Sequence, residues 1–179
     1  ASSAASDVYK RQKADSLFAE VDSCYKRLQH RAMLSSVSLS VVSELKSGSA
    51  WYVPGGRSTM GRLFNDACGR YVFAEDKHSG SIPLAFETVF DKAGDADVWI
   101  IKYNRDRDMS YSDLKADYIG YTGFKAFKTR NIYGCNTAKV PFYEETPFRP
   151  DYLLADLIQI LHPEIGDLGG LRYFCKLNE

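Results

Sequence analysis

Apolar side chains recur at a helical spacing near the start of the chain. Charged side chains take the opposite face, and the spacing of three or four residues is that of one side of an α-helix. The apolar positions are Ala14, Leu17, Phe18, Val21, Tyr25, Leu28 and Ala32. We expect a long amphipathic helix over residues 14–33 whose apolar face is covered. Residues 1–13 lack this stripe, which predicts a disordered or non-native lead.

Further along, alternating or β-branched runs that predict strands are interleaved with helical patterns. The expected strands cover residues 36–45, 71–74, 97–103, 131–136 and 171–177, the last at a sheet edge. The expected helices begin at Ser58, Phe86, Ser110, Tyr121 and Pro150. The run 97–103 is apolar on both faces, as in a central parallel strand. The pattern predicts an α/β fold with a mainly parallel sheet and helices on both faces.

A glycine-rich segment lies between the first predicted strand and the helix that Ser58 caps. Residues 51–56 read Trp-Tyr-Val-Pro-Gly-Gly, which predicts a loop. In open α/β sheets ligands bind beyond the carboxyl ends of the strands, where such loops lie. Trp51 and Tyr52 beside glycines would offer a flat apolar wall to a bulky ligand. The alternative is a surface turn with a half-buried tryptophan.

Composition and charge narrow the classes of function. The chain has 179 residues, enough for one domain, and its 23 basic and 23 acidic residues give no electrostatic case for nucleic acid. No run approaches the roughly 20 apolar residues of a membrane-spanning helix, which predicts a soluble chain. Four cysteines form no CxxC pair and are expected to be buried free thiols, at Cys24, Cys68, Cys135 and Cys175.

The segment 51–62 also resembles a phosphate-binding loop, but incompletely. Gly56 and Gly61 have the glycine spacing of that motif, whereas Arg62 replaces its lysine and Leu63 replaces its magnesium-binding hydroxyl. Nucleotide hydrolysis is therefore disfavoured. A small α/β enzyme that uses this loop stays open as an alternative.

Other catalytic arrangements are incomplete. The chain has no G-x-S-x-G motif, and the adjacent carboxylates Glu144 and Glu145 are expected to point to opposite sides. No segment gathers enough ligands for a metal site. His78 lies in a polar loop that we expect to return to the glycine-rich rim. The sequence favours a binding protein over an enzyme.

The expected ligand site combines loop aromatics, polar side chains and glycine backbone. Its members are Trp51, Tyr52, Gly55, Gly56, Arg57, Ser58, His78, Tyr143, Glu144 and Arg149. We expect these residues to share one concave face.

The order of several short motifs resembles a known family. The motifs on which the resemblance rests are Trp51-Tyr-Val-Pro-Gly-Gly-Arg-Ser-Thr-Met-Gly-Arg-Leu with Ala67-Cys-Gly, Ala96-Asp-Val-Trp-Ile, Asn131-Ile-Tyr-Gly-Cys-Asn and Arg149-Pro-Asp-Tyr-Leu-Leu-Ala-Asp-Leu. They resemble the carboxyl-terminal lobe of periplasmic substrate-binding proteins (TroA-like, helical-backbone class) of iron-siderophore, haem and cobalamin ABC importers. The resemblance covers roughly residue 14 to the end.

The resemblance implies a fold and a role. Residues 14–33 would be the end of the helix that connects two lobes, and residues 34–179 a Rossmann-like ligand-binding lobe, with the amino-terminal lobe missing. The ligand would be an iron-siderophore, haem or cobalamin, with no intrinsic cofactor. The implied partner is a membrane permease, contacted by Asp66 or Glu75, and the implied location is the periplasm or a lipid anchor in the cell envelope. A homodimer through the exposed connector helix or the cleft wall is the remaining alternative.

Overall fold

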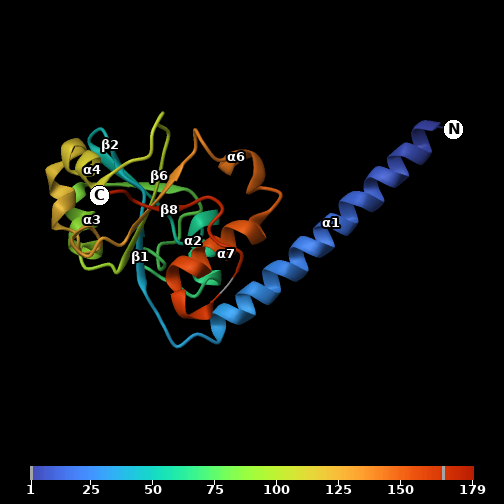
Figure 1. The fold of residues 1–179 in the computed structure, drawn as a ribbon, viewed down its shortest axis with the longest axis horizontal. Coiled ribbons are helices and arrows are strands. Elements are labelled where there is room, and N and C mark those ends of the chain that lie inside the picture. The colour runs from blue at the N-terminus through green and yellow to red at the C-terminus, as the bar shows by residue number, and fades with distance from the viewer. Residues whose placement is uncertain (1, 167) are drawn as a thin grey trace.

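The computed structural model describes residues 2–166 and 168–179 and shows an α/β lobe from which one long helix projects (Figure 1). The main sheet has the strand order β4-β1-β6-β7-β8, in which all pairs are parallel except β7 with β8. Its strands are β1 (Ser40–Ser43), β4 (Arg70–Tyr71), β6 (Val98–Tyr103), β7 (Ile132–Asn136) and β8 (Cys175–Lys176). The mainly parallel sheet, the central position of β6 and the final edge strand are confirmed.

Helices cover both faces of this sheet, as predicted. In Figure 1 α2 and α7 lie on one side and α3 and α4 on the other. The helices are α2 (Thr59–Asp66), α3 (Phe86–Ala93), α4 (Tyr111–Asp117), α5 (Lys125–Lys128), α6 (Phe142–Glu145) and α7 (Pro150–Leu161), with 3-10 turns at Ile119–Gly123 and Pro163–Ile165. Ser58 caps α2, Ser110 and Asp113 form a capping box on α4, and Pro150 occupies the first turn of α7.

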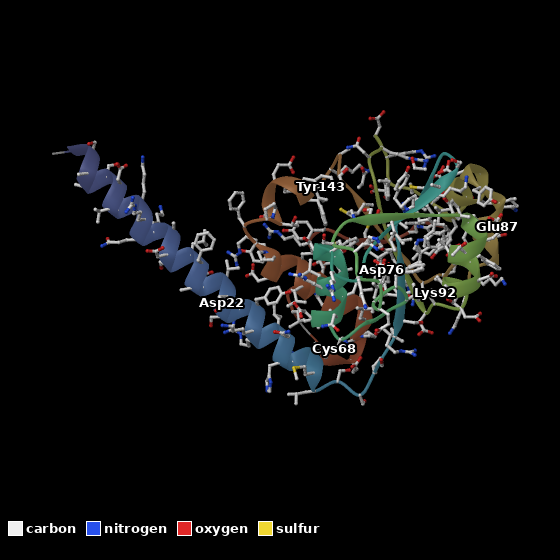
Figure 2. The ribbon with its side chains drawn as sticks, turned by 180° about the vertical axis from the view of Figure 1, so that it is seen from behind. Asp22, Cys68, Asp76, Glu87, Lys92 and Tyr143 are labelled. Atoms are coloured by element: carbon white, nitrogen blue, oxygen red, sulfur yellow. The ribbon has the colours of Figure 1, made fainter. Side chains whose placement is uncertain are left out.

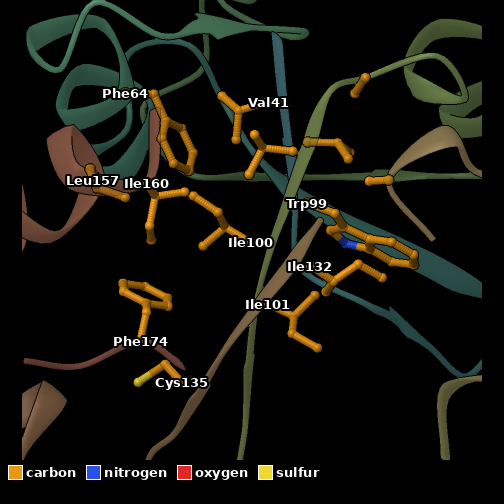
Figure 3. Packing of buried hydrophobic residues seen from close by; sticks show 14 of the residues in the cluster. Val41, Phe64, Trp99, Ile100, Ile101, Ile132, Cys135, Leu157, Ile160 and Phe174 are labelled. Carbon is orange, nitrogen blue, oxygen red and sulfur yellow. The ribbon is translucent and has the colours of Figure 1, made fainter. Parts of the chain in front are cut away.

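Side chains of β6 alternate between the two halves of the core. Figure 3 shows Ile100 on the side of Phe64 and Ile160, whereas Trp99 and Ile101 point to the other side. All are nearly or fully buried. The alternation follows from the two-residue period of a strand and explains why this run is apolar on both faces.

A second, antiparallel sheet corrects the prediction that residues 51–56 form a loop. It has the order β2-β3-β5, with strands β2 (Lys46–Ser47), β3 (Ala50–Pro54) and β5 (Ser81–Leu84). Gly48 has φ 60° in the turn between β2 and β3, a conformation that glycine adopts at little cost. Trp51 and Val53 are buried while Tyr52 between them is exposed, and this alternation is that of a strand. The segment is too short for the alternation to be recognised in the sequence.

The first helix, α1 (Ser2–Met33), begins twelve residues before the predicted start at Ala14. Its first half contains no glycine or proline, so nothing in the sequence interrupts the helix. The apolar face is covered only in the second half, where Val21 and Ala32 are buried and the helix packs on α7. Residues 3–20 are exposed, including Phe18.

Several other boundaries and burials differ from the predictions. The helix expected from Tyr121 is a 3-10 turn followed by the four residues of α5, and the expected loop 137–149 contains α6. All four cysteines are free, but only Cys135 is buried. Among the described helices, none is both long enough and apolar enough to cross a bilayer.

Candidate functional site

A cleft of about 480 Å³ lies at the carboxyl edge of the parallel strands. Glu44 directly follows β1 and Lys102 lies near the end of β6, so the ends of two neighbouring strands form its floor. The second sheet, the start of α2, the loop before β5 and α6 supply the rest. The lining residues are Glu44, Leu45, Ser47, Tyr52, Pro54, Ser58, Thr59, Met60, Ser79, Gly80, Ser81, Lys102 and Tyr143. This position is where open α/β sheets bind ligands.

The predicted glycine-rich rim is held by backbone hydrogen bonds. Gly55 N–H donates to the Gly80 carbonyl at 2.9 Å, and Arg57 N–H donates to the His78 carbonyl at 3.1 Å. A Cβ on Gly55 would lie 2.2 Å from that His78 oxygen, and one on Gly56 would lie 2.2 Å from the Ala74 oxygen. The polar loop therefore returns to this rim as predicted. Because Gly55 and Gly56 have no side chains, that loop can approach the rim closely.

Ser58 has a local structural role at the cleft. Its hydroxyl donates to the Gly55 carbonyl at 2.6 Å and accepts from Gly61 N–H at 3.1 Å. These bonds cap α2 and fix the turn that leads from β3 into the helix. Because the residue is only 9% exposed and its hydroxyl makes both of these bonds, a ligand would not meet a free hydroxyl.

Two predicted aromatic residues both line the cleft. Tyr52 on β3 is 49% exposed and Tyr143 on α6 is 62% exposed, and both rings line the cleft. Figure 2 shows Tyr143 on α6. Exposed tyrosines of this kind give apolar contact and a hydroxyl to the same ligand.

Trp51 is not part of this wall, which corrects its predicted ligand contact. Its ring is fully buried, 5.6 Å from the ring of Trp99 and 5.6 Å from that of Phe124 between centroids. The indole N–H donates to the Ser43 carbonyl at 3.0 Å. Trp51 therefore fastens the second sheet to the main sheet, which places its neighbour Tyr52 at the cleft.

Besides Trp51 and the two rim glycines Gly55 and Gly56, four predicted residues lie outside the lining of the cleft. Arg149 makes two hydrogen bonds to Asp151, at 2.9 and 2.6 Å, and this pairing raises the pKa of its guanidinium. His78 is exposed beside Asp76, and the His78 backbone N–H lowers the pKa of the Asp76 carboxyl. Arg57 and Glu144 are exposed on the flanking segments.

The predicted permease contacts occupy different environments. Asp66 at the end of α2 accepts hydrogen bonds from α1, from the Tyr25 hydroxyl at 2.6 Å and from the Gln29 amide at 3.0 Å. Burial first, and then the bond to Asp66, raise the pKa of Tyr25. Both carboxylate oxygens of Asp66 are thus used to hold α1 on the lobe. Glu75 is exposed in the loop after β4.

The sequence reasoning missed the charged floor of the cleft. The Lys102 ammonium contacts the Glu44 carboxylate, and the two side chains are only 15% and 20% exposed. The available signal was their position, since Glu44 directly follows β1, Lys102 lies near the end of the neighbouring parallel strand β6, and the two carry opposite charges. Among the described residues, no group of three or more His, Cys, Asp or Glu side chains is arranged to hold a metal ion.

These features define an α/β lobe with an open cleft at the carboxyl edge of its parallel strands. Residues 2–138 match the family model described as periplasmic binding protein, and the chain belongs to this family. It is a family of binding proteins, not of enzymes.

Two relatives are uncharacterized lipoproteins of Methanocaldococcus jannaschii. One is 31% identical over 133 residues, which cover 73% of this chain and 31% of the lipoprotein. The other is 27% identical over 177 residues, which cover 96% of this chain and 43% of the lipoprotein. The chain spans less than half the length of either relative.

Solved structures share the fold. A TroA-like periplasmic binding protein, FepB, from Veillonella parvula aligns with a TM-score of 0.66 at 14% identity, covering 89% of this chain and 56% of that one. A protein described as an ABC-type Fe³⁺-hydroxamate transport system, from Saccharomonospora viridis, aligns with a TM-score of 0.66 at 15% identity, covering 87% and 53%. At these identities the likeness shows the fold alone.

Proposed function

We propose that this chain is one ligand-binding lobe of a substrate-binding protein that delivers a bulky metal chelate to an ABC importer permease. The observation that carries the proposal is the cleft at the carboxyl edge, with Tyr52 and Tyr143 exposed on it. Its volume of about 480 Å³ is within the range of pockets that bind organic ligands. The chelate would be an iron-siderophore, haem or cobalamin, and the Fe³⁺-hydroxamate description of the Saccharomonospora viridis protein favours the first.

The longer relatives support a two-lobe arrangement. We propose that residues 14–33 belong to the connector between lobes and that residues 34–179 form the lobe that bears this cleft. A second lobe facing the cleft would cover the exposed tyrosines and bury more of the ligand, which raises affinity. The lipoprotein descriptions of the two Methanocaldococcus jannaschii relatives favour a place in the cell envelope, through a lipid anchor or in the periplasm.

Calorimetric titration with a ferric hydroxamate, haem and cobalamin tests the proposed ligand class. We expect one of the three chelates to bind, and Tyr52→Ala and Tyr143→Ala each to weaken that binding about tenfold or more, because each removes an aromatic contact. Phe148→Ala is the matched control, since this ring is 63% exposed but lies outside the cleft lining. Absence of binding by all three chelates, or an equal loss in the control, would contradict the proposal.

An exposed carboxylate of this lobe is the expected contact with the permease. Because Asp66 is occupied by α1, we propose Glu75 as the contact of this lobe with a permease arginine. Glu75→Gln is expected to lower ligand uptake by the reconstituted importer without changing ligand affinity. Glu87→Gln, an exposed acid on α3, serves as the control.

A homodimer remains a separate prediction. It depends on the exposed apolar side chains of α1, among them Tyr9 and Phe18. Light scattering of the chain over a range of concentrations checks it.

A further inference from the structure

The charged side chains of the cleft neutralise one another. Among the described residues that line it, the charged ones are Glu44 and Lys102, and they contact each other on its floor. The Lys102 ammonium also lies 5.7 Å from the centroid of the Phe142 ring. The remaining cations that the sequence suggested, Arg57 and Arg149, lie outside the lining. The cleft therefore presents no net charge to a ligand.

The backbone holds Glu44 in place beside Lys102. Glu44 has φ 67°, in the left-handed region that residues other than glycine rarely adopt. Its N–H donates to the Ile100 carbonyl at 2.9 Å, and its carbonyl accepts from the Trp99 indole N–H at 2.9 Å. Conformations of this kind persist where the surroundings fix them, and they gather at ligand sites. Glu44 is thus fixed at the end of β1, with its carboxylate over β6.

This arrangement penalises an anionic ligand. To reach the Lys102 ammonium, an anion would approach the Glu44 carboxylate and be repelled by it, or it would displace that carboxylate. Displacement would leave a carboxylate that is only 20% exposed without its cation, which is costly away from bulk water. A neutral ligand meets neither cost.

The rest of the lining suits a neutral, oxygen-rich ligand. Hydroxyl groups can donate to ligand carbonyls and accept from ligand amides, whichever the ligand offers. The lining residues that offer such hydroxyls are Ser47, Tyr52, Thr59, Ser79, Ser81 and Tyr143, since the Ser58 hydroxyl is used to cap α2.

We propose that Glu44 sets the charge selectivity of the cleft. Because of Glu44, the cleft accepts a net-neutral chelate with many oxygen atoms and rejects a polyanionic chelate. This inference rests on the proposed function and specifies its ligand class. Glu44 acts by pairing its carboxylate with the Lys102 ammonium, which is then not free to bind an anion.

Titration of the full chain with two ferric chelates tests the inference. The probes are a net-neutral ferric trihydroxamate and a polyanionic ferric tris-catecholate, each followed by calorimetry. We expect wild type to prefer the neutral chelate. Glu44→Gln frees the ammonium of Lys102, so we expect it to shift the ratio of the two affinities toward the anion by about tenfold or more. This gain is expected to fall with added salt.

Two further variants make the outcome specific. The double variant E44Q/K102M has no charge in the floor, so we expect the ratio of its affinities for the two chelates to show no gain for the anion. Glu44→Asn removes the charge with a residue that tolerates left-handed φ, and it replaces Glu44→Gln if that variant unfolds. Thermal unfolding of each variant verifies its fold.

The outcomes separate the inference from the proposed function. If wild type binds the anionic chelate as tightly as the neutral one, or if Glu44→Gln leaves the ratio within about twofold, the cleft binds chelates but Glu44 does not select them. An equal gain in the double variant also overturns the inference, because Lys102 would not be the group released. If wild type and all variants bind neither ferric chelate, this inference fails, and the titration with haem and cobalamin decides whether the proposed function fails with it.

Discussion

The carboxylate of Asp113 is held by groups from two directions. It accepts hydrogen bonds from the Arg107 guanidinium at 2.8 and 2.6 Å and from Ser110 N–H at 2.8 Å. The bond from Arg107 first, and then that from Ser110, hold the pKa of Asp113 well below its usual range. A carboxyl whose pKa is lower in the folded state stabilises the fold above its unfolded pKa of about 3.9. This contribution is lost as the pH falls through the folded pKa.

Asp113→Asn is therefore expected to cost about 1 kcal/mol of unfolding free energy at neutral pH, the usual loss for a helix cap. The difference from wild type is expected to shrink below about pH 4, where protonation begins to remove the same contribution from wild type. Thermal unfolding of both proteins from pH 7 to pH 2 measures it. Asp106→Asn, at a neighbouring exposed acid, provides the control. A difference that stays constant with pH would contradict this account.

Residue roles that depend on local sequence were predictable. Ser58 and Ser110 each cap a helix by bonding to the backbone of a residue three positions later, so both partners of each cap lie within one short stretch of sequence. Trp51 was misassigned because its ring partners come from the packed fold. The partner of Arg149 is local, since Asp151 lies two residues further along the chain. Trp99 lies 48 residues from Trp51, and the pattern of large aromatic side chains is the same for a core as for a ligand wall. The Glu44 contact with Lys102 is likewise set by strand pairing across 58 residues.

At the scale of elements, the rim between β3 and α2 depends on the absence of a side chain at Gly56. A Cβ there would lie 2.2 Å from the Ala74 oxygen and 2.5 Å from the Asp76 oxygen, and both belong to the backbone. Gly56→Ala is expected to lower the unfolding free energy by roughly 1–3 kcal/mol, the range for overpacking, and to weaken ligand binding by moving this rim. Chemical denaturation with calorimetry checks both effects.

Gly80→Ala is the matched control for this rim. Gly80 lies on the same loop and accepts from Gly55 N–H, but a Cβ there would meet nothing within 4 Å. We expect its unfolding free energy to stay within about 0.5 kcal/mol of wild type. Equal losses in the two variants would mean that close packing at Gly56 is not the cause.

The attachment of α1 makes a second prediction at this scale. Asp66→Asn is expected to weaken the bonds from Tyr25 and Gln29 and to speed amide exchange in residues 21–33, while the central strand β6 stays protected. Hydrogen exchange by mass spectrometry resolves the two regions. Lys26→Ala, in an exposed pair with Asp22 on α1, should leave exchange unchanged. Unchanged exchange in Asp66→Asn would remove Asp66 from its anchoring role.

Helix and strand periodicity predicted most elements but not their ends. β6 and α7 have long, consistent apolar patterns, so their positions were clear from the sequence. β3 has five residues and follows a two-residue strand, too short for a two-residue period to stand out from a loop with aromatic side chains. The start of α1 was misplaced because an exposed helix needs only favourable propensity and no apolar stripe.

At the scale of the whole molecule, the pattern of alternating elements predicted the parallel sheet and hence the edge at which the cleft lies. It could not predict the second sheet, which closes one side of the cleft and places Tyr52 there. That sheet depends on the pairing of β3 with β5, whose partners lie about thirty residues apart.

A buried carboxylate helps to hold the C-terminal segment on the lobe. Asp156 on α7 is 1% exposed and accepts hydrogen bonds from the backbone N–H groups of Arg172, Tyr173 and Phe174, at 2.8, 2.7 and 3.2 Å. Tyr173 and Phe174 belong to the same core cluster as Trp99. The segment that leads into β8 is thus packed in the core of the lobe and not merely attached to its surface.

Asp156→Asn tests whether this segment unfolds with the rest of the lobe. The amide would present N–H donors to backbone donors, so we expect the unfolding free energy to fall by roughly 2 kcal/mol. Because the segment shares the core, tryptophan fluorescence, which reports Trp51 and Trp99, and proteolysis of residues 172–179 should show the same lowered transition. Glu87→Gln controls for loss of a surface charge. Early cleavage of the C-terminal segment with an unchanged tryptophan transition would instead make it an independent unit, and the lobe would then end at α7.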